Sequence, residues 1–449
     1  MTDHIPKDVI YAAKRMSNYN RNRFRLETVS SDTSGPNKIV TVNMPENATL
    51  DMKSFKFHFD AQTDEQVESG ATVRGRLPAD ASSLIQRIEV YINGIQVMGS
   101  LSEYGTAARM LKIARSNRDR DGSIDRSLSH GAVTDANTVE DVSIVMRDWI
   151  GFLGESAPRY LNTDMLGQIQ VRITFAPASV LIAKENSVAI DNTDLSNLNA
   201  RTAAGRLSYT ISNMFFTVDS VQIDEMYTQM LRERLSTEDF IPINYKEYYN
   251  FSLDNITGAR HSTRFSLSVT SLDRIYATFR NSNFQTTGVK GFLMGGSSFS
   301  ENLCSNALHF KSFNNSNSKE GSFKYQFKVN NVSYPQYKAG VLDALFDLAH
   351  TTDKVHSSTP GFMPTSLQQY NDGMFVLPLT LCHPGEDLHS QTGYNSKGIN
   401  TQLVLEVEGQ VPPTADPDAQ TTDSISSYVL CETTAQLRVG LGRNIGVAF

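Results

Sequence analysis

The residues best suited to chemistry lie together near the C-terminus, in residues 382–389. This segment holds Cys382, His383, Glu386, Asp387 and His389, and a bound metal needs a cluster of such ligands. A Pro-Gly pair in its middle predicts a turn, however, and no second pair of ligands follows at the spacing of a zinc site. The sequence therefore favours a polar loop between strands over a metal site.

Two other segments imitate ligand-binding loops. Asn117, Asp119 and Asp121 resemble the start of a calcium loop, but the twelfth position is Leu128, where such a loop needs a bidentate glutamate. Residues 291–296 are rich in glycine and lack the Lys-Ser/Thr of a phosphate-binding loop. No Ser/His/Asp order or zinc-protease motif is recognisable. We therefore predict no catalytic residue, no cofactor and no metal, and expect a protein that is not an enzyme.

Basic residues gather in the first segment, residues 1–36, where no strand-like alternation occurs. We expect an arm here. It is either a solvated terminus or an arm that docks on a neighbouring subunit or an anionic surface. Nucleic-acid binding as the main task is disfavoured, because the whole chain carries a net charge of −7. The basic residues of this candidate arm are Lys7, Lys14, Arg15, Arg21, Arg23 and Arg25.

Composition is that of a globular protein with room for more than one core. The chain has 449 residues, of which 39% are hydrophobic and 20% charged. Its three cysteines, Cys304, Cys382 and Cys431, are odd in number and far apart, which favours buried thiols in a reducing compartment over a disulfide framework. No apolar run is long enough to cross a bilayer, and the N-terminal residues lack the apolar core of a signal peptide.

Alternating residues predict that most of the chain is β-structure. In residues 168–175, Ile169, Val171, Ile173 and Phe175 alternate with polar residues, which is typical of a half-buried strand. Helical spacing is rare and predicts a helix over 104–115 and another that ends at 236–237. Similar alternation predicts strands at residues 39–43, 55–59, 88–92, 207–211, 265–269, 275–279, 323–329, 403–408 and 428–430.

The order of these elements repeats along the chain. The strand at Ile169 recurs at Leu403, an offset of 234 residues, and the strand that ends at Ile92 recurs at Val329, an offset of 237. The helical pattern from Tyr104 recurs from residue 337, an offset of 233, while other strands recur at 219 and 220. Since the differences fall in connections, which vary most in length, we interpret the chain as two similar units in tandem.

The size of the units predicts their fold. Each has about 200 residues, which suits an eight-stranded jelly roll, whereas an immunoglobulin-like sandwich needs only about 100. The predicted fold is therefore all-β, with two tandem eight-stranded antiparallel jelly rolls and a few short helices. The expected boundaries are an arm at 1–36, a first roll at 37–224, a linker helix and connection at 225–244, and a second roll at 245–449.

With this organisation the chain resembles the double jelly-roll major capsid proteins of icosahedral double-stranded DNA viruses, nearest to those of virophages, polinton-like viruses and nucleocytoplasmic large DNA viruses. The resemblance is carried by the segments SLIQRIEVYING at 83–94, SLDRIYATFR at 271–280 and GYNSKGIN at 393–400, together with the order of the strands. It implies a structural subunit that forms homotrimers, in which six rolls give a pseudo-hexagonal capsomer that tiles an icosahedral shell.

The resemblance also implies partners and a location. Besides neighbouring capsomers, these are penton and minor capsid proteins, an internal membrane or the genome contacted through the arm, and a host-surface receptor contacted by outer loops such as residues 177–205. The protein would belong to the virion capsid and assemble in the host cytoplasm or nucleus. The alternative is a tandem β-sandwich that binds or acts on carbohydrates, but a single tryptophan, no signal peptide and no recognisable acid pair disfavour it.

Overall fold

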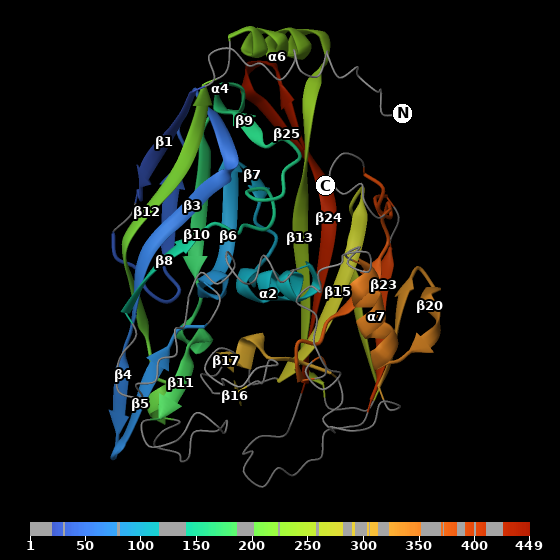
Figure 1. Cartoon of the computed structure of the whole chain (residues 1–449). Coiled ribbons are helices and arrows are strands. Elements are labelled where there is room, and N and C mark those ends of the chain that lie inside the picture. Colours follow the sequence, from blue (N-terminus) through green and yellow to red (C-terminus); the bar gives the residue numbers. More distant parts are fainter. Residues whose placement is uncertain are drawn as a thin grey trace, which may run out of the picture.

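The structure is a computed structural model in which the two halves of the chain stand side by side (Figure 1). Antiparallel strands make almost all of it, as the alternating sequence predicts. The residues that the structure describes are 20–29, 32–78, 81–115, 141–185, 202–222, 225–256, 260–281, 290–291, 303–304, 306–312, 323–351, 370, 372–383, 391–398, 401–409 and 425–449.

The first half of the chain forms two facing sheets, which we call the first roll. The outer sheet has the order β1-β12-β3-β8, with β9 beside β3, and the inner sheet has the order β2-β10-β6-β7. Aromatic rings such as Phe57 and Phe175, with centroids 6.2 Å apart, pack between the two sheets. The strands are β1 (Asn20–Glu27), β2 (Ile39–Asn43), β3 (Thr49–Thr63), β6 (Ile85–Ile92), β7 (Ile95–Met98), β8 (Asp141–Met146), β9 (Tyr160–Asn162), β10 (Ile169–Phe175) and β12 (Tyr209–Gln222).

The second half repeats this arrangement and is called the second roll. Its first sheet has the order β13-β24-β15-β18-β21, with β22 beside β15 and β25 beside β24, and its second has the order β14-β23-β19-β20. The strands are β13 (Phe240–Ile256), β14 (Arg260–Ser266), β15 (Leu272–Asn281), β18 (Phe310–Lys311), β19 (Lys324–Val329), β20 (Val332–Ala339), β21 (Asp372–Gly373), β22 (Leu377–Thr380), β23 (Gln402–Glu408), β24 (Ile425–Gly440) and β25 (Asn444–Ala448).

The predicted fold class is therefore confirmed, and the repeat is visible strand by strand. The two strands that first suggested it, β10 and β23, hold the same place beside the strands β6 and β19. The turns after β6 and β19 also match. Asn93 and Gly94 have φ of 49° and 80°, and Asn330 and Asn331 have φ of 47° and 70°, the left-handed pair that a tight hairpin requires.

The helix of the repeat is placed differently from the prediction in one roll. Helix α2 (Tyr104–Arg115) has the predicted bounds, but α7 (Val341–Thr351) begins after Tyr337, which lies in β20. The offset from Tyr104 to Val341 is 237 residues, the same as that of the preceding hairpin. Tyr337 was wrongly assigned to the helix because a tyrosine four residues before an apolar residue fits a helical pattern as well as a strand end.

A strand precedes residue 37, in the segment where the sequence shows no strand-like alternation. Strand β1 pairs with β12 along its whole length, from Asn20 opposite Gln222 to Glu27 opposite Phe215. Seven of its eight side chains are exposed, so it has no apolar alternation to reveal it, and backbone pairing at the sheet edge suffices. In addition, β13 starts at Phe240, inside the predicted linker 225–244.

Short elements mark the two ends of the molecule. Helix α6 (Glu225–Thr237) lies where a linker helix was predicted and, with α4 (Thr163–Leu166), occupies the upper end in Figure 1. The small strands β4 (Glu65–Glu68), β5 (Ala71–Arg76), β11 (Ile182–Glu185), β16 (Lys290–Gly291) and β17 (Leu303–Cys304) lie towards the opposite end. They belong to connections between the main strands. These five short strands therefore lie together at one end of the molecule.

Candidate functional site: the contact between the two rolls

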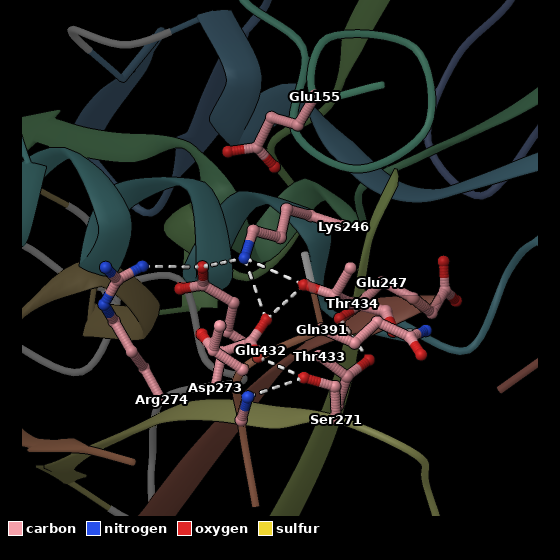
Figure 2. A network of polar contacts seen from close by, with 12 residues as sticks. Glu155, Lys246, Glu247, Ser271, Asp273, Arg274, Gln391, Glu432, Thr433 and Thr434 are labelled. Carbon is pink, nitrogen blue, oxygen red and sulfur yellow. Dashed lines mark hydrogen bonds and ion pairs between the residues drawn. The ribbon is translucent and has the colours of Figure 1, made fainter. Parts of the chain in front are cut away.

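A buried cluster of charges lies on the face of the second roll that meets the first roll (Figure 2). The Lys246 ammonium on β13 lies 2.8 Å from Oδ2 of Asp273 on β15 and 3.4 Å from Oε1 of Glu432 on β24. Arg274 approaches the same Glu432 oxygen at 3.0 Å. None of these four side chains is more than 8% exposed. Two cations and two anions thus balance each other away from water.

Hydroxyl groups also form hydrogen bonds with these charged side chains. Thr434 donates to Oδ2 of Asp273 and lies 3.1 Å from the Lys246 ammonium. Ser271 donates to Oδ1 of Asp273 at 2.7 Å, and the backbone N–H of Gly393 donates to the Ser271 hydroxyl. Buried ions are tolerated only when they are paired and hydrogen-bonded in this way. The cluster consequently fixes three neighbouring strands in one register.

The first roll covers this cluster with the loop that follows β8. Oε2 of Glu155 accepts hydrogen bonds from the Tyr248 hydroxyl at 2.7 Å and from the Gly151 N–H at 2.9 Å. Its backbone carbonyl accepts from the N–H of Lys246, and the N–H of Ala157 donates to the carbonyl of Asn244. One loop of the first roll is therefore bonded to the backbone and side chains of β13.

A second set of contacts runs from β7 to the start of α2. Tyr245 donates from its hydroxyl to the carbonyl of Val97, and Phe152 packs edge-on against the Tyr245 ring at 5.3 Å. Arg280, which is fully buried, pairs with Glu103 at 2.8 Å. Ser102 joins these contacts through hydrogen bonds to Asn250. Together they make the contact between the rolls apolar at its centre and ionic around it.

Glu247 is the one acid of this contact whose charge is poorly compensated. Its Oε1 accepts a hydrogen bond from the N–H of Ser100 at 3.3 Å, whereas its buried Oε2 meets no hydrogen-bond partner among the described residues. Burial raises the pKa of Glu247 to about 7, and the hydrogen bonds from Ser100 oppose that rise only in part. The carboxyl group is thus partly protonated at neutral pH.

This raised pKa predicts a loss of stability with rising pH. The folded protein holds the Glu247 proton up to about pH 7, whereas an unfolded chain releases it near 4.5, so the folded state is favoured at low pH. Between these values the free energy of unfolding should fall by about 3 kcal/mol. Urea titrations at pH 5 and pH 8 measure it, with Glu247→Gln as the control. If the free energy of unfolding changes equally with pH in the wild type and in Glu247→Gln, the raised pKa of Glu247 is contradicted.

Buried groups join the two rolls. The charged side chains of the cluster are buried and, among the described residues, bonded to one another and to neighbouring hydroxyl groups. The bonds that cross from the first roll to the second can hold the two β-sandwiches in a fixed orientation.

The predicted arm residues are only partly described. Lys7, Lys14 and Arg15 lie outside the described residues, while Arg21, Arg23 and Arg25 lie on β1. Arg21 and Arg23 both donate to the Asp219 carboxylate on β12 at 2.7 Å. The hydrogen bond from Arg23 lowers the pKa of Asp219 and raises that of Arg23 itself. Arg25 stacks over the Phe215 ring at 4.2 Å. That these arginines face the interior of a shell stays a prediction.

The other candidate segments lie largely outside the described residues. This holds for residues 117–128, 292–296 and 384–390. Cys382 is half-buried, Cys431 is buried, and both are free thiols. Within the described ranges, no three potential ligands gather closely enough to hold a metal ion. No described helix is both long and apolar enough to cross a membrane.

The buried cluster itself was not predicted. None of Lys246, Asp273 and Glu432 lies within a strand that alternation predicts. A lysine in a strand normally marks a solvated face. The only available signal was the length of β13 and β24. The residues that pack on the two faces of these strands cannot be read from one sequence.

Several solved structures share this architecture. No family model and no curated sequence matches the chain. Among solved structures, the capsid of PBCV-1 virus matches with a TM-score of 0.61 and 12% identity, covering 97% of this chain and 98% of that one. The Faustovirus major capsid protein matches with 0.57 and 8% identity over 98% and 92% of the two chains. The Sputnik virophage structure matches with 0.53 and 13% identity over 97% and 89%.

These matches run through both rolls and the contact between them. At such identities they establish the fold and leave the function to be argued from the geometry. The resemblance predicted from the sequence is confirmed at that level: the chain has the double jelly-roll fold found in the capsid proteins of these large DNA viruses and of a virophage.

Proposed function

We propose that this chain is a viral major capsid protein, a structural subunit that trimerises into pseudo-hexagonal capsomers tiling an icosahedral shell. The observation that carries the proposal is the doubled roll, with the second copy of the fold held against the first by contacts that include the buried ion pair of Arg280 with Glu103. Support comes from the match of nearly the whole chain to the PBCV-1 virus capsid and the Faustovirus major capsid protein.

The duplication explains how such a subunit works without catalysis. Three copies related by a threefold axis present six similar rolls, so their outline approaches a hexagon. Closed rotational symmetry then reuses one interface three times. A rigid contact between the rolls is needed, because a hinge inside each subunit would distort the tile.

The ends of the molecule suggest its orientation and partners. In this proposal the end that carries β4, β5, β11, β16 and β17 faces outward, where its long connections meet a host-surface receptor. The opposite end and the N-terminal residues face inward, towards an internal membrane or the genome. Penton and minor capsid proteins contact the sides. The protein then resides in the virion capsid after assembly in the host cytoplasm or nucleus.

The boundaries of the arm, the two rolls and the linker belong to the same proposal. The sheets suggest a first roll that begins with β1 at Asn20 and a second that begins with β13 at Phe240. An arm then comprises fewer residues than the predicted 1–36, and α6 with its flanks forms the linker. Limited proteolysis with mass spectrometry tests these limits, since cleavage should concentrate before residue 20 and between 223 and 239.

The molar mass in solution tests the function itself. Light scattering of the purified protein should give about 149 kDa, three times the 49.8 kDa of one chain. The trimer should persist on dilution to micromolar concentration. A protein that remains a monomer at every concentration would overturn the proposal. A monomer that also binds a glycan array saturably would favour the carbohydrate-binding alternative.

A further inference from the structure

The first roll carries a charge cluster that matches the buried cluster of the second roll. Arg21 on β1 lies 3.2 Å from Asp51 on β3 and donates to Asp219 on β12. In the sheet orders, β1, β12 and β3 hold the places of β13, β24 and β15. A base on the edge strand and an acid on each of the next two strands thus occur in both rolls.

The strand registers show that these positions are equivalent. Arg21 precedes Arg23, which lies opposite Asp219, as Lys246 precedes Tyr248, which lies opposite Glu432. In each roll the third member of the cluster lies at an irregularity of strand pairing, between Thr217 and Asp219 in the first roll and between Leu272 and Arg274 in the second. The offset from β1 to β13 is therefore 225 residues.

The two clusters differ in what covers them. In the second roll β15 is buried at every residue from 272 to 280, because the first roll packs on its outer face. In the first roll the acids Asp51 and Asp219 are buried, but the side chains of Arg21 and Arg23 are 40% and 59% exposed. The same polar site is thus complete in one roll and open in the other.

The surface that provides the cover also occurs twice. The first roll covers the second with residues 97–106, which join β7 to α2. The corresponding part of the second roll joins β20 to α7 and lies at the far edge of the molecule from β1 (Figure 1). It exposes large apolar side chains, which we call the α7 face: Val332, Tyr337, Leu342 and Phe346.

We propose that the α7 face of one copy packs on the open outer face of β1, β12 and β3 in the next copy, repeating between chains the contact that joins the rolls within a chain. This inference rests on the proposed function, since it names the surfaces that would make the trimer. A head-to-tail contact of this kind closes into a ring when its rotation allows.

Charge and shape of the two surfaces agree with this pairing. The β1 side presents Arg21, Arg23 and Arg159, which outnumber the two acids that they bind. Helix α7 carries Asp343 and Asp347 and contains no lysine or arginine. Phe24, exposed at 41%, holds the position of Tyr249, an aromatic residue of the contact between the rolls. An acidic, apolar face thus meets a basic one with an exposed ring.

A disulfide between copies tests the pairing directly. Ser100 contacts Glu247 within the chain, and the corresponding residues are Tyr337 and Asn22. These lie on opposite sides of one molecule, so Asn22→Cys with Tyr337→Cys can bridge only between copies. Mild oxidation should give covalent dimers and a terminal covalent trimer on a non-reducing gel. The pair Asn22→Cys with Met230→Cys, whose second residue is exposed on α6, should give neither.

A second variant asks whether the α7 face stabilises the trimer. Phe346 is 64% exposed, so Phe346→Asp should leave the folded monomer intact, which circular dichroism and urea unfolding verify. On dilution its trimer should dissociate at concentrations at least tenfold higher than the wild-type trimer does, because it needs at least tenfold more protein to form. Val67→Asp, at an equally exposed residue on β4, should behave as the wild type.

The outcomes separate this inference from the proposed function. If the wild type is a trimer but the 22/337 pair fails to cross-link and Phe346→Asp dissociates like the wild type, the surfaces are wrong and the capsomer proposal stands. If the wild type is a monomer, both fall. Cross-linking that ends at the trimer, combined with weakening by Phe346→Asp, supports the inference.

Discussion

Replacing Lys246 by methionine should lower the free energy of unfolding by about 3–5 kcal/mol. The substitution removes the ammonium that lies between Asp273 and Glu432 and leaves the buried Asp273 carboxylate without the cation that neutralises it. Hydroxyl groups still donate to that carboxylate, but they supply no charge. Urea unfolding followed by fluorescence measures the change.

An exposed lysine provides the control for this prediction. Lys338 pairs with Glu408 at the surface, where its side chain is 43% exposed, and such pairs contribute no more than about 1 kcal/mol. Lys338→Met should therefore leave the unfolding midpoint nearly unchanged. Equal effects of the two substitutions would show that the buried cluster does not stabilise the contact between the rolls.

Replacing Phe152 by alanine should cost about 3–5 kcal/mol and uncouple the two rolls. The Phe152 ring is fully buried and packs against Tyr245, so it joins a loop of the first roll to β13 of the second. The cavity left behind weakens this contact more than it weakens either sandwich. Calorimetry should show one transition split into two.

Leu253 on β13 is the matched control, because its side chain is 42% exposed and lies away from the first roll's loop. Leu253→Ala should lower stability by less than about 1 kcal/mol and keep a single transition. If Phe152→Ala also unfolds in a single unshifted transition, the rolls are not joined through this ring.

The fold could be predicted because its signal is local and repeated. Strands such as β10 and β23 bury one face, and their burial alternates residue by residue, so the sequence shows the period of two directly. The recurrence of the Asn-containing hairpin and of the helix after it then revealed the duplication. Within this repeated pattern, the start of α7 was misplaced.

Elements without an apolar face could not be found in this way. Strand β1 is held by backbone pairing and by arginines bound to Asp219, so its residues read as a basic arm. The hairpin of β4 and β5 lies at residues 65–76, where the sequence predicted no strand. For such edge strands, the tertiary partner decides the structure and local preference does not.

The buried cluster could not be predicted from the sequence for a different reason. Lys246, Asp273 and Glu432 lie on three different strands and meet only when β13, β24 and β15 pair in one sheet. Nothing in a single strand distinguishes a lysine that faces water from one that faces another domain. The equivalence of Arg21 and Lys246 likewise became visible only from the pairing registers.

The central claim is that the contact between rolls is repeated between copies to form a six-lobed, threefold particle. Electron cryomicroscopy of the purified oligomer tests it most directly. We predict a closed trimer in which six similar rolls surround the axis and α7 of each copy lies against β1 of the next. A trimer that buries other surfaces would contradict the inferred contact, and particles with only two lobes would contradict the capsomer itself.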